Sequence, residues 1–181
     1  MPGAARTVFT IGHSTQSLDE LIGLLRGVSV DLLVDVRSLP RSRRNPQWNA
    51  ETMAAPLAAA GIGYRHLLAL GGLRRRAKEA PPSPNDLWRN AAFRNFADYA
   101  ESEAFRAGLD ALLAFLAIHR LAILCAEAVW WRCHRRIIAD YVLAAGVPVA
   151  HIMAKGRIEP ARMTAGAEPL PDGRIRYREK G

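Results

Sequence analysis

The feature that most constrains the fold is a strand, a helix and a second strand that follow one another within residues 6–38. Residues 6–12, RTVFTIG, are β-branched and aromatic and end in glycine, and residues 31–38, DLLVDVRS, are nearly all apolar up to Asp35. Such an apolar run is typical of a strand covered on both faces. Ser17 and Glu20 have the spacing of a capping box at the start of the intervening helix. A right-handed parallel crossover is therefore expected.

The alternation of strands and helices continues to residue 152. Helices are expected over about residues 52–60, 91–102, 102–120 and 133–146, and strands over 61–67, 121–126 and 147–152. Pro56 is expected in the first turn of its helix, where no amide is needed. We therefore predict an α/β fold: a three-layer single domain with a mostly parallel sheet of about five strands and helices on both faces.

The expected α/β domain comprises residues 1–155. From Gly156 onward the hydrophobic pattern fades, and an Asp-Gly turn occurs at residues 172–173. Residues 156–181 are thus expected to be a C-terminal extension, either a hairpin or a loose tail.

The composition indicates where the protein is located and what kind of ligand it binds. The chain of 181 residues is 50% hydrophobic, enough for one core. No apolar run is long enough to span a bilayer and the opening residues lack the centre of a secretory signal, so we expect a cytoplasmic protein with no membrane partner. The net charge is +8, supplied mainly by arginine, which suits phosphate and carboxylate groups. An anionic ligand, such as a nucleotide or nucleic acid, is expected, although a GC-rich genome would give the same composition.

Polar residues cluster where the expected strands end. His13 and Ser14 follow the first strand, and Asp35 ends the second. Cys125 ends a later strand, and Cys133 stands where the next helix begins. Ligands of parallel sheets bind beyond the carboxyl ends of the strands. We therefore predict one shared site with the catalytic residues Asp35, Cys125, Glu127, Cys133 and His134 and the ligand-binding residues His13, Ser14, Arg37, Arg41, Arg43, Trp48, Asn49 and Arg135.

Either cysteine is a candidate nucleophile. Cys133 lies at a helix start beside Arg132, His134 and Arg135, surroundings that favour a thiolate. Cys125 ends a strand before a loop and a helix, as the nucleophile of phosphatases and rhodaneses does. The loop is not that of a cysteine phosphatase, because Arg132 comes one residue too late and glycine is scarce. A permanent disulfide is not expected in a reducing compartment, but the two thiols are close enough for a redox pair.

Each candidate also has a structural interpretation. His13 either caps a turn or takes part in function, and Asp35 either forms an ion pair with Arg37 or acts as a general base. Glu127 either pairs with Arg135 or does acid–base work. Trp48 is interleaved with basic residues and is therefore a candidate for stacking on a base.

A metal site is a further alternative. Cys125, Cys133, His134 and His13 all lie near the same strand ends. Their spacing matches no standard zinc pattern, which usually begins with two closely spaced cysteines. We therefore predict no metal ligands and no cofactor.

The motifs FTIGHST, DVRSLPRSRRNPQWN, GIGYRHLLALGG and LCAEAVWWRCHRRIIADYVLAAGVPVAHI closely resemble a bacterial and archaeal family named domain of unknown function 488. The resemblance spans residues 7–152. The family tends to have proline where this chain has Trp130. Because the family carries no established activity, the resemblance implies the family and not the reaction.

The leading functional interpretation is an enzyme-like domain that binds a phosphate-bearing or other anionic ligand in a pocket rich in cysteine, histidine and arginine. One alternative is a non-catalytic nucleic-acid-binding module that uses the same basic rim. Another is a thiol-based sulfur-transfer or redox protein. A nucleic-acid binder should show a steep fall of affinity with salt, whereas an enzyme should show an enclosed pocket.

Overall fold

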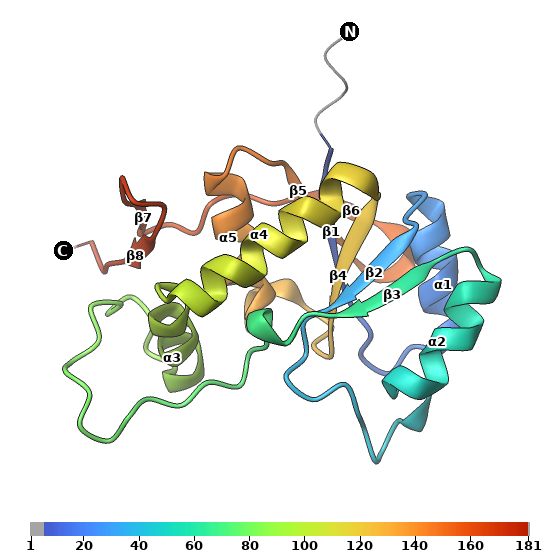
Figure 1. Cartoon of the computed structure of the whole chain (residues 1–181), viewed down its shortest axis with the longest axis horizontal. Coiled ribbons are helices and arrows are strands. Elements are labelled where there is room, and N and C mark those ends of the chain that lie inside the picture. Colours follow the sequence, from blue (N-terminus) through green and yellow to red (C-terminus); the bar gives the residue numbers. More distant parts are fainter. Residues whose placement is uncertain (1–5, 181) are drawn as a thin grey trace, which may run out of the picture.

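The computed structural model describes residues 6–180, so the first five residues of the expected domain and residue 181 lie outside the described part (Figure 1). Five strands run parallel in the order β3-β2-β4-β1-β5, and β6 adds an antiparallel edge beside β5. The sheet consists of β1 (Val8–Gly12), β2 (Leu32–Asp35), β3 (Gly63–His66), β4 (Leu121–Cys125), β5 (Val149–Ile152) and β6 (Ile158–Pro160). The predicted mostly parallel α/β sheet is confirmed.

Helices cover both faces of the sheet, as Figure 1 shows. The helices are α1 (Leu18–Gly27), α2 (Ala50–Ala59), α3 (Ala91–Ala100), α4 (Glu103–Ile118) and α5 (Arg135–Ala144). Two hydrophobic cores result: Leu33 and Leu124 pack with α1 and α2, while Val34 and Ile123 pack with the other three helices. All four side chains are fully buried, as expected for central strands. None of the helices within residues 6–180 has the length and apolar character needed to cross a bilayer.

The helix ends follow the sequence signals, with one exception. The Ser17 hydroxyl accepts from the Glu20 amide at 3.1 Å, and the Glu20 carboxylate accepts from the Ser17 amide at 2.7 Å, which confirms the capping box. The position predicted for Pro56 is wrong. The helix α2 begins at Ala50, directly after a short 3-10 turn (Pro46–Trp48), so Pro56 lies in its second turn. Proline leaves the Thr52 carbonyl without its helical donor, and both residues are exposed, so that water can reach this carbonyl.

Residues 156–180 share the core of the domain. After β6, the strands β7 (Ala167–Pro169) and β8 (Ile175–Tyr177) form a hairpin around the Asp-Gly turn. Ile175 and Tyr177 are fully buried, and the Tyr177 hydroxyl donates to the Asp140 carboxylate of α5 at 2.9 Å. The segment forms a hairpin that packs against α5.

Candidate functional site

The carboxyl ends of three neighbouring strands meet at one edge of the sheet. Gly12 of β1 pairs with Cys125 of β4, and Asp35 of β2 pairs with Leu124. The loops that follow these strands line an open cavity of about 560 Å³. Eight of the predicted site residues line it: His13, Ser14, Arg37, Arg41, Cys125, Glu127, Cys133 and His134. The other five, Asp35, Arg43, Trp48, Asn49 and Arg135, are not among the lining residues.

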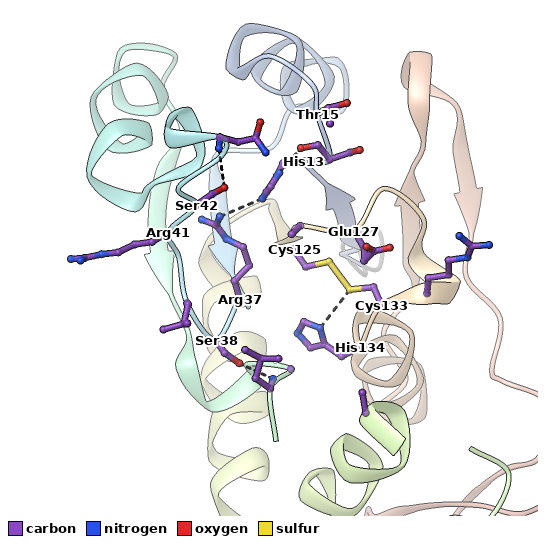
Figure 2. Close-up of a pocket in the computed structure, with 18 of the residues that line it drawn as sticks. His13, Thr15, Arg37, Ser38, Arg41, Ser42, Cys125, Glu127, Cys133 and His134 are labelled. Atoms are coloured by element: carbon purple, nitrogen blue, oxygen red, sulfur yellow. Dashed lines mark hydrogen bonds between the residues drawn. A yellow bond between two sulfur atoms is a disulfide. The ribbon is translucent and has the colours of Figure 1, made fainter. Parts of the chain in front are cut away.

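Cys125 and Cys133 face each other in the cavity wall and are joined as a disulfide (Figure 2). Both side chains are buried. Their Cα atoms are 7.7 Å apart, beyond the range of roughly 4.4–6.8 Å usual for protein disulfides. The backbone is therefore not spaced as in a permanent structural crosslink.

The imidazole of His134 is oriented toward the sulfur of Cys133. Its Nε2 lies 2.8 Å from the Val36 carbonyl oxygen, which can only accept, so Nε2 carries the proton. Nδ1 then presents its lone pair to Cys133 Sγ at 3.5 Å. Burial lowers the pKa of His134 to about 4, so the ring is neutral at pH 7. A neutral imidazole in this tautomer can take a proton from a thiol.

The start of α5 provides a second contact to the same sulfur. The backbone amide of Arg135 donates to Cys133 Sγ at 3.4 Å. Amides at a helix N-terminus favour negative charge, so this contact stabilises a thiolate once the disulfide is reduced.

Asp35 lies behind the cavity, where it holds Arg37 in place. Its carboxylate accepts from Arg37 Nε at 2.9 Å and Nη2 at 2.6 Å, and from the Tyr64 hydroxyl at 2.6 Å. Burial, with a contribution from Asp35, raises the pKa of Tyr64, so the tyrosine remains a donor. The structure thus contains the ion pair of the structural interpretation, and Asp35 has no free oxygen directed at a ligand.

Arg37 also fixes the tautomer of His13. The guanidinium Nη1 lies 3.3 Å from His13 Nε2, and because arginine can only donate, Nε2 accepts. The Nδ1 proton then goes to the Ser14 carbonyl at 2.9 Å. Burial and then the Arg37 charge lower the pKa of His13, although the bond to Ser14 opposes them. His13 is therefore a neutral ring whose two nitrogens are both in use.

The prediction that Trp48 stacks on a nucleic-acid base is wrong, because its side chain is fully buried. The indole stacks on His13, with ring centroids 4.4 Å apart and planes 14° apart, and its backbone carbonyl accepts from Arg37 at 2.8 Å. It therefore supports the cavity from behind. Aromatic and basic residues alternate in the sequence here, but the aromatic ring points into the core.

Arg135 supports the loop after β4 from beneath and does not reach the cavity. It is 1% exposed, and its Nη2 donates to the Glu127 backbone carbonyl at 2.7 Å. Burial lowers its pKa to about 10, against the attraction of Glu127, so it remains cationic at pH 7. A Cβ on Gly12 would lie 1.6 Å from the same carbonyl oxygen, so only glycine fits there. The Glu127 side chain is exposed at the cavity.

The remaining predicted residues lie farther out. Arg41 points away from the cavity centre in Figure 2, and its Nη2 pairs with Glu51 at 3.2 Å. Arg43 is exposed, and the Asn49 side chain accepts from the Ser42 amide at 2.7 Å, which shapes the loop after β2. These residues are peripheral to the cysteine pair.

Several lining residues were not predicted. The hydroxyl and amide side chains of Ser38, Ser42 and Asn45 belong to the same loop as Arg37, so the polar character of that loop was a usable signal. Leu73 and Phe93 come from distant segments and have no local signal. Leu73 is held there because its amide donates to Ser38 Oγ at 2.8 Å.

Comparison with known proteins identifies the family to which this chain belongs. The family model described as Domain of unknown function DUF488 matches residues 17–142, which include β2, β4 and the segment from Cys125 to His134. No curated protein and no solved structure matches the chain. The match confirms the resemblance that the sequence motifs indicated and covers more than half of the chain. The chain therefore belongs to the family of the domain of unknown function DUF488.

Proposed function

We propose that this chain is an enzyme in which the Cys133 sulfur acts as a nucleophile on a small anionic ligand bound in the cavity. The observation that carries the proposal is the surroundings of that sulfur. It faces the lone pair of His134 Nδ1 at 3.5 Å and accepts the Arg135 amide at 3.4 Å. A neighbouring base and a helix N-terminus are the two features that activate a thiol.

The reaction begins from the reduced protein. A dithiol reductant, of the kind a reducing cytoplasm supplies, opens the disulfide and is itself oxidised to a disulfide. As the Cys133 sulfur attacks, its proton passes to His134 Nδ1, which acts as a general base. The sulfur forms a bond to an electrophilic atom of the ligand, and the leaving group departs with the electron pair of the bond that breaks. The leaving group takes up the proton that His134 has accepted, and the Glu127 carboxylate, exposed at the cavity, is placed to relay it.

The charge of the lining favours an anionic ligand. Three arginines, Arg37, Arg41 and Arg132, line the cavity together with a single carboxylate, that of Glu127. Guanidinium groups and hydroxyls such as Ser14 suit the oxygens of a phosphate group. Because Asp35 neutralises part of the Arg37 charge, Arg132 is the lining arginine we expect to contribute most to binding. The ligand we propose is phosphate-bearing, such as a nucleotide.

Protection of the thiol by inorganic phosphate tests the anion site. In the reduced protein, phosphate should slow the alkylation of Cys133 by iodoacetamide, whereas chloride at equal ionic strength should not. Arg132→Gln should lose much of this protection. Arg26→Gln is the matched control, because Arg26 is an exposed arginine of α1 outside the cavity lining. Equal rates with phosphate and chloride would refute the anionic ligand.

A second candidate, a thiol–disulfide redox or sulfur-transfer protein, is favoured by the Cys125–Cys133 contact itself. It predicts that a redox partner opens and closes this disulfide reversibly, with no need for an anion. The nucleic-acid-binding module is less well supported because Trp48, its proposed stacking residue, is buried. That module requires an affinity for nucleic acid that falls steeply with salt.

A further inference from the structure

We infer that the reduced pocket binds a single zinc ion through Cys125, Cys133 and His134. This inference goes beyond the proposed function and does not depend on it. One donor atom from each of the three residues, the two Sγ atoms and His134 Nδ1, lies within 4.8 Å of the other two. Sulfur and imidazole nitrogen are the ligand types that zinc prefers.

The spacing of sulfur and nitrogen fits a zinc ion. Bonds of about 2.3 Å to sulfur and about 2.0–2.1 Å to nitrogen, arranged tetrahedrally, put the two ligand atoms about 3.6 Å apart. Cys133 Sγ and His134 Nδ1 are 3.5 Å apart. This pair therefore has the separation of two zinc ligands.

Reduction gives the two sulfurs room to move apart. The Cα atoms of Cys125 and Cys133 are already 7.7 Å apart, so the side chains can separate to the roughly 3.8 Å of two sulfur ligands on a tetrahedral zinc ion. A dithiol reductant supplies two electrons and two protons to the disulfide. Zn²⁺ then displaces the two thiol protons, and the two thiolates neutralise its charge, as burial of the site requires.

His134 is positioned as a metal ligand usually is. Its Nε2 proton is held by the Val36 carbonyl at 2.8 Å, which leaves Nδ1 for the metal. The ring also packs edge-on against Phe96, with centroids 5.0 Å apart. A Cβ on Gly72 would lie 2.6 Å from His134 Nδ1, so glycine leaves the space that the ring and its ligand need.

Three protein ligands leave the fourth position open to the cavity. Catalytic zinc sites have this arrangement, whereas structural sites have four protein ligands. Because zinc and an electrophile would compete for the Cys133 sulfur, the zinc-loaded state would protect this thiol from alkylation. The metal would thus control when the thiol is available.

Cobalt titration tests the site, since Co²⁺ reports thiolate ligation by its absorption. Reduced, metal-free protein should bind one Co²⁺ per chain with a thiolate charge-transfer band, and Zn²⁺ should displace it. Cys125→Ser, Cys133→Ser and His134→Gln should each weaken binding by at least about tenfold. The control His119→Gln, at a partly exposed histidine at the end of α4, should bind as the wild type does. Circular dichroism would confirm that each variant is folded.

Two results would overturn the zinc site: no cobalt uptake by the reduced protein, or unchanged affinity in the folded His134→Gln and Cys125→Ser variants. Neither result would contradict the proposed function, because alkylation of metal-free protein measures the reactivity of the Cys133 thiol separately. Conversely, cobalt binding with an unreactive Cys133 would support the zinc site and refute the thiol enzyme.

Discussion

His151 should make the stability of the fold sensitive to mild acid. The side chain is 2% exposed, its Nδ1 lies 2.7 Å from Thr10 Oγ1, and its ring stacks on Trp130 with centroids 4.5 Å apart. Burial, and then the charge of Arg135, lower its pKa to about 4. The unfolded chain has the ordinary value of about 6.5, so between these values the unfolded state binds more protons. The free energy of unfolding should therefore have its full value above about pH 6.5 and fall as the pH drops toward 4.

The size of this loss follows from the two pKa values. The pKa of His151 is about 4 in the folded chain and about 6.5 in the unfolded chain. Through proton linkage, this difference lowers the free energy of unfolding by about 2 kcal/mol between pH 7.5 and about pH 5. Urea unfolding at both pH values measures it. His151→Gln should lose about 2 kcal/mol less than the wild type over this interval, even if the variant is less stable throughout.

The control for this prediction is His119→Gln, which changes a partly exposed histidine directly after α4. It should keep nearly all of the pH dependence of the wild type, because its exposed ion pair with Asp31 contributes little to stability. If His151→Gln also loses as much stability as the wild type, His151 is not held as a buried neutral ring, and the reasoning from its burial fails.

Two substitutions test how the site is supported. Gly12→Ala should lower the free energy of unfolding by about 1–3 kcal/mol or more, because its Cβ would overlap the Glu127 carbonyl. The control is Gly23→Ala, where the added Cβ meets open space. It should instead raise the free energy of unfolding by up to about 1 kcal/mol. Similar effects of the two changes in urea unfolding would contradict this close approach. Asp35→Asn should lower the free energy of unfolding by about 3–5 kcal/mol, because it leaves Arg37 buried without its carboxylate. A loss below about 1 kcal/mol would show that the ion pair does not stabilise this side of the cavity.

The sequence predicted the sheet and the edge where the candidate site lies, because both depend on local patterns. Apolar runs such as residues 32–34 identify buried strands, and parallel strands necessarily bring their carboxyl ends to one edge. His13 therefore lines one cavity with Cys125 and His134, although it is more than 100 positions away in the chain.

The sequence could not show which polar residues face that cavity. Asp35 and Arg37 differ by two positions, yet the carboxylate lies behind the cavity and the guanidinium lines it. Trp48 packs into the core, where its indole stacks on the distant His13, a contact that no local pattern indicates. Phe93 reaches the cavity only through the packing of α3, which leaves no short-range pattern in the sequence.

The alkylation rate of Cys133 tests the proposed thiol chemistry most directly. The Cys125→Ser variant, reduced and metal-free, cannot form the internal disulfide and isolates the Cys133 thiol. Its reaction with iodoacetamide near pH 6 should be faster than that of free cysteine, because the Arg135 amide favours the thiolate and His134 Nδ1 can take the thiol proton as the sulfur reacts. His134→Gln in the same background should slow it. A native thiol that reacts only after unfolding would contradict a nucleophilic Cys133.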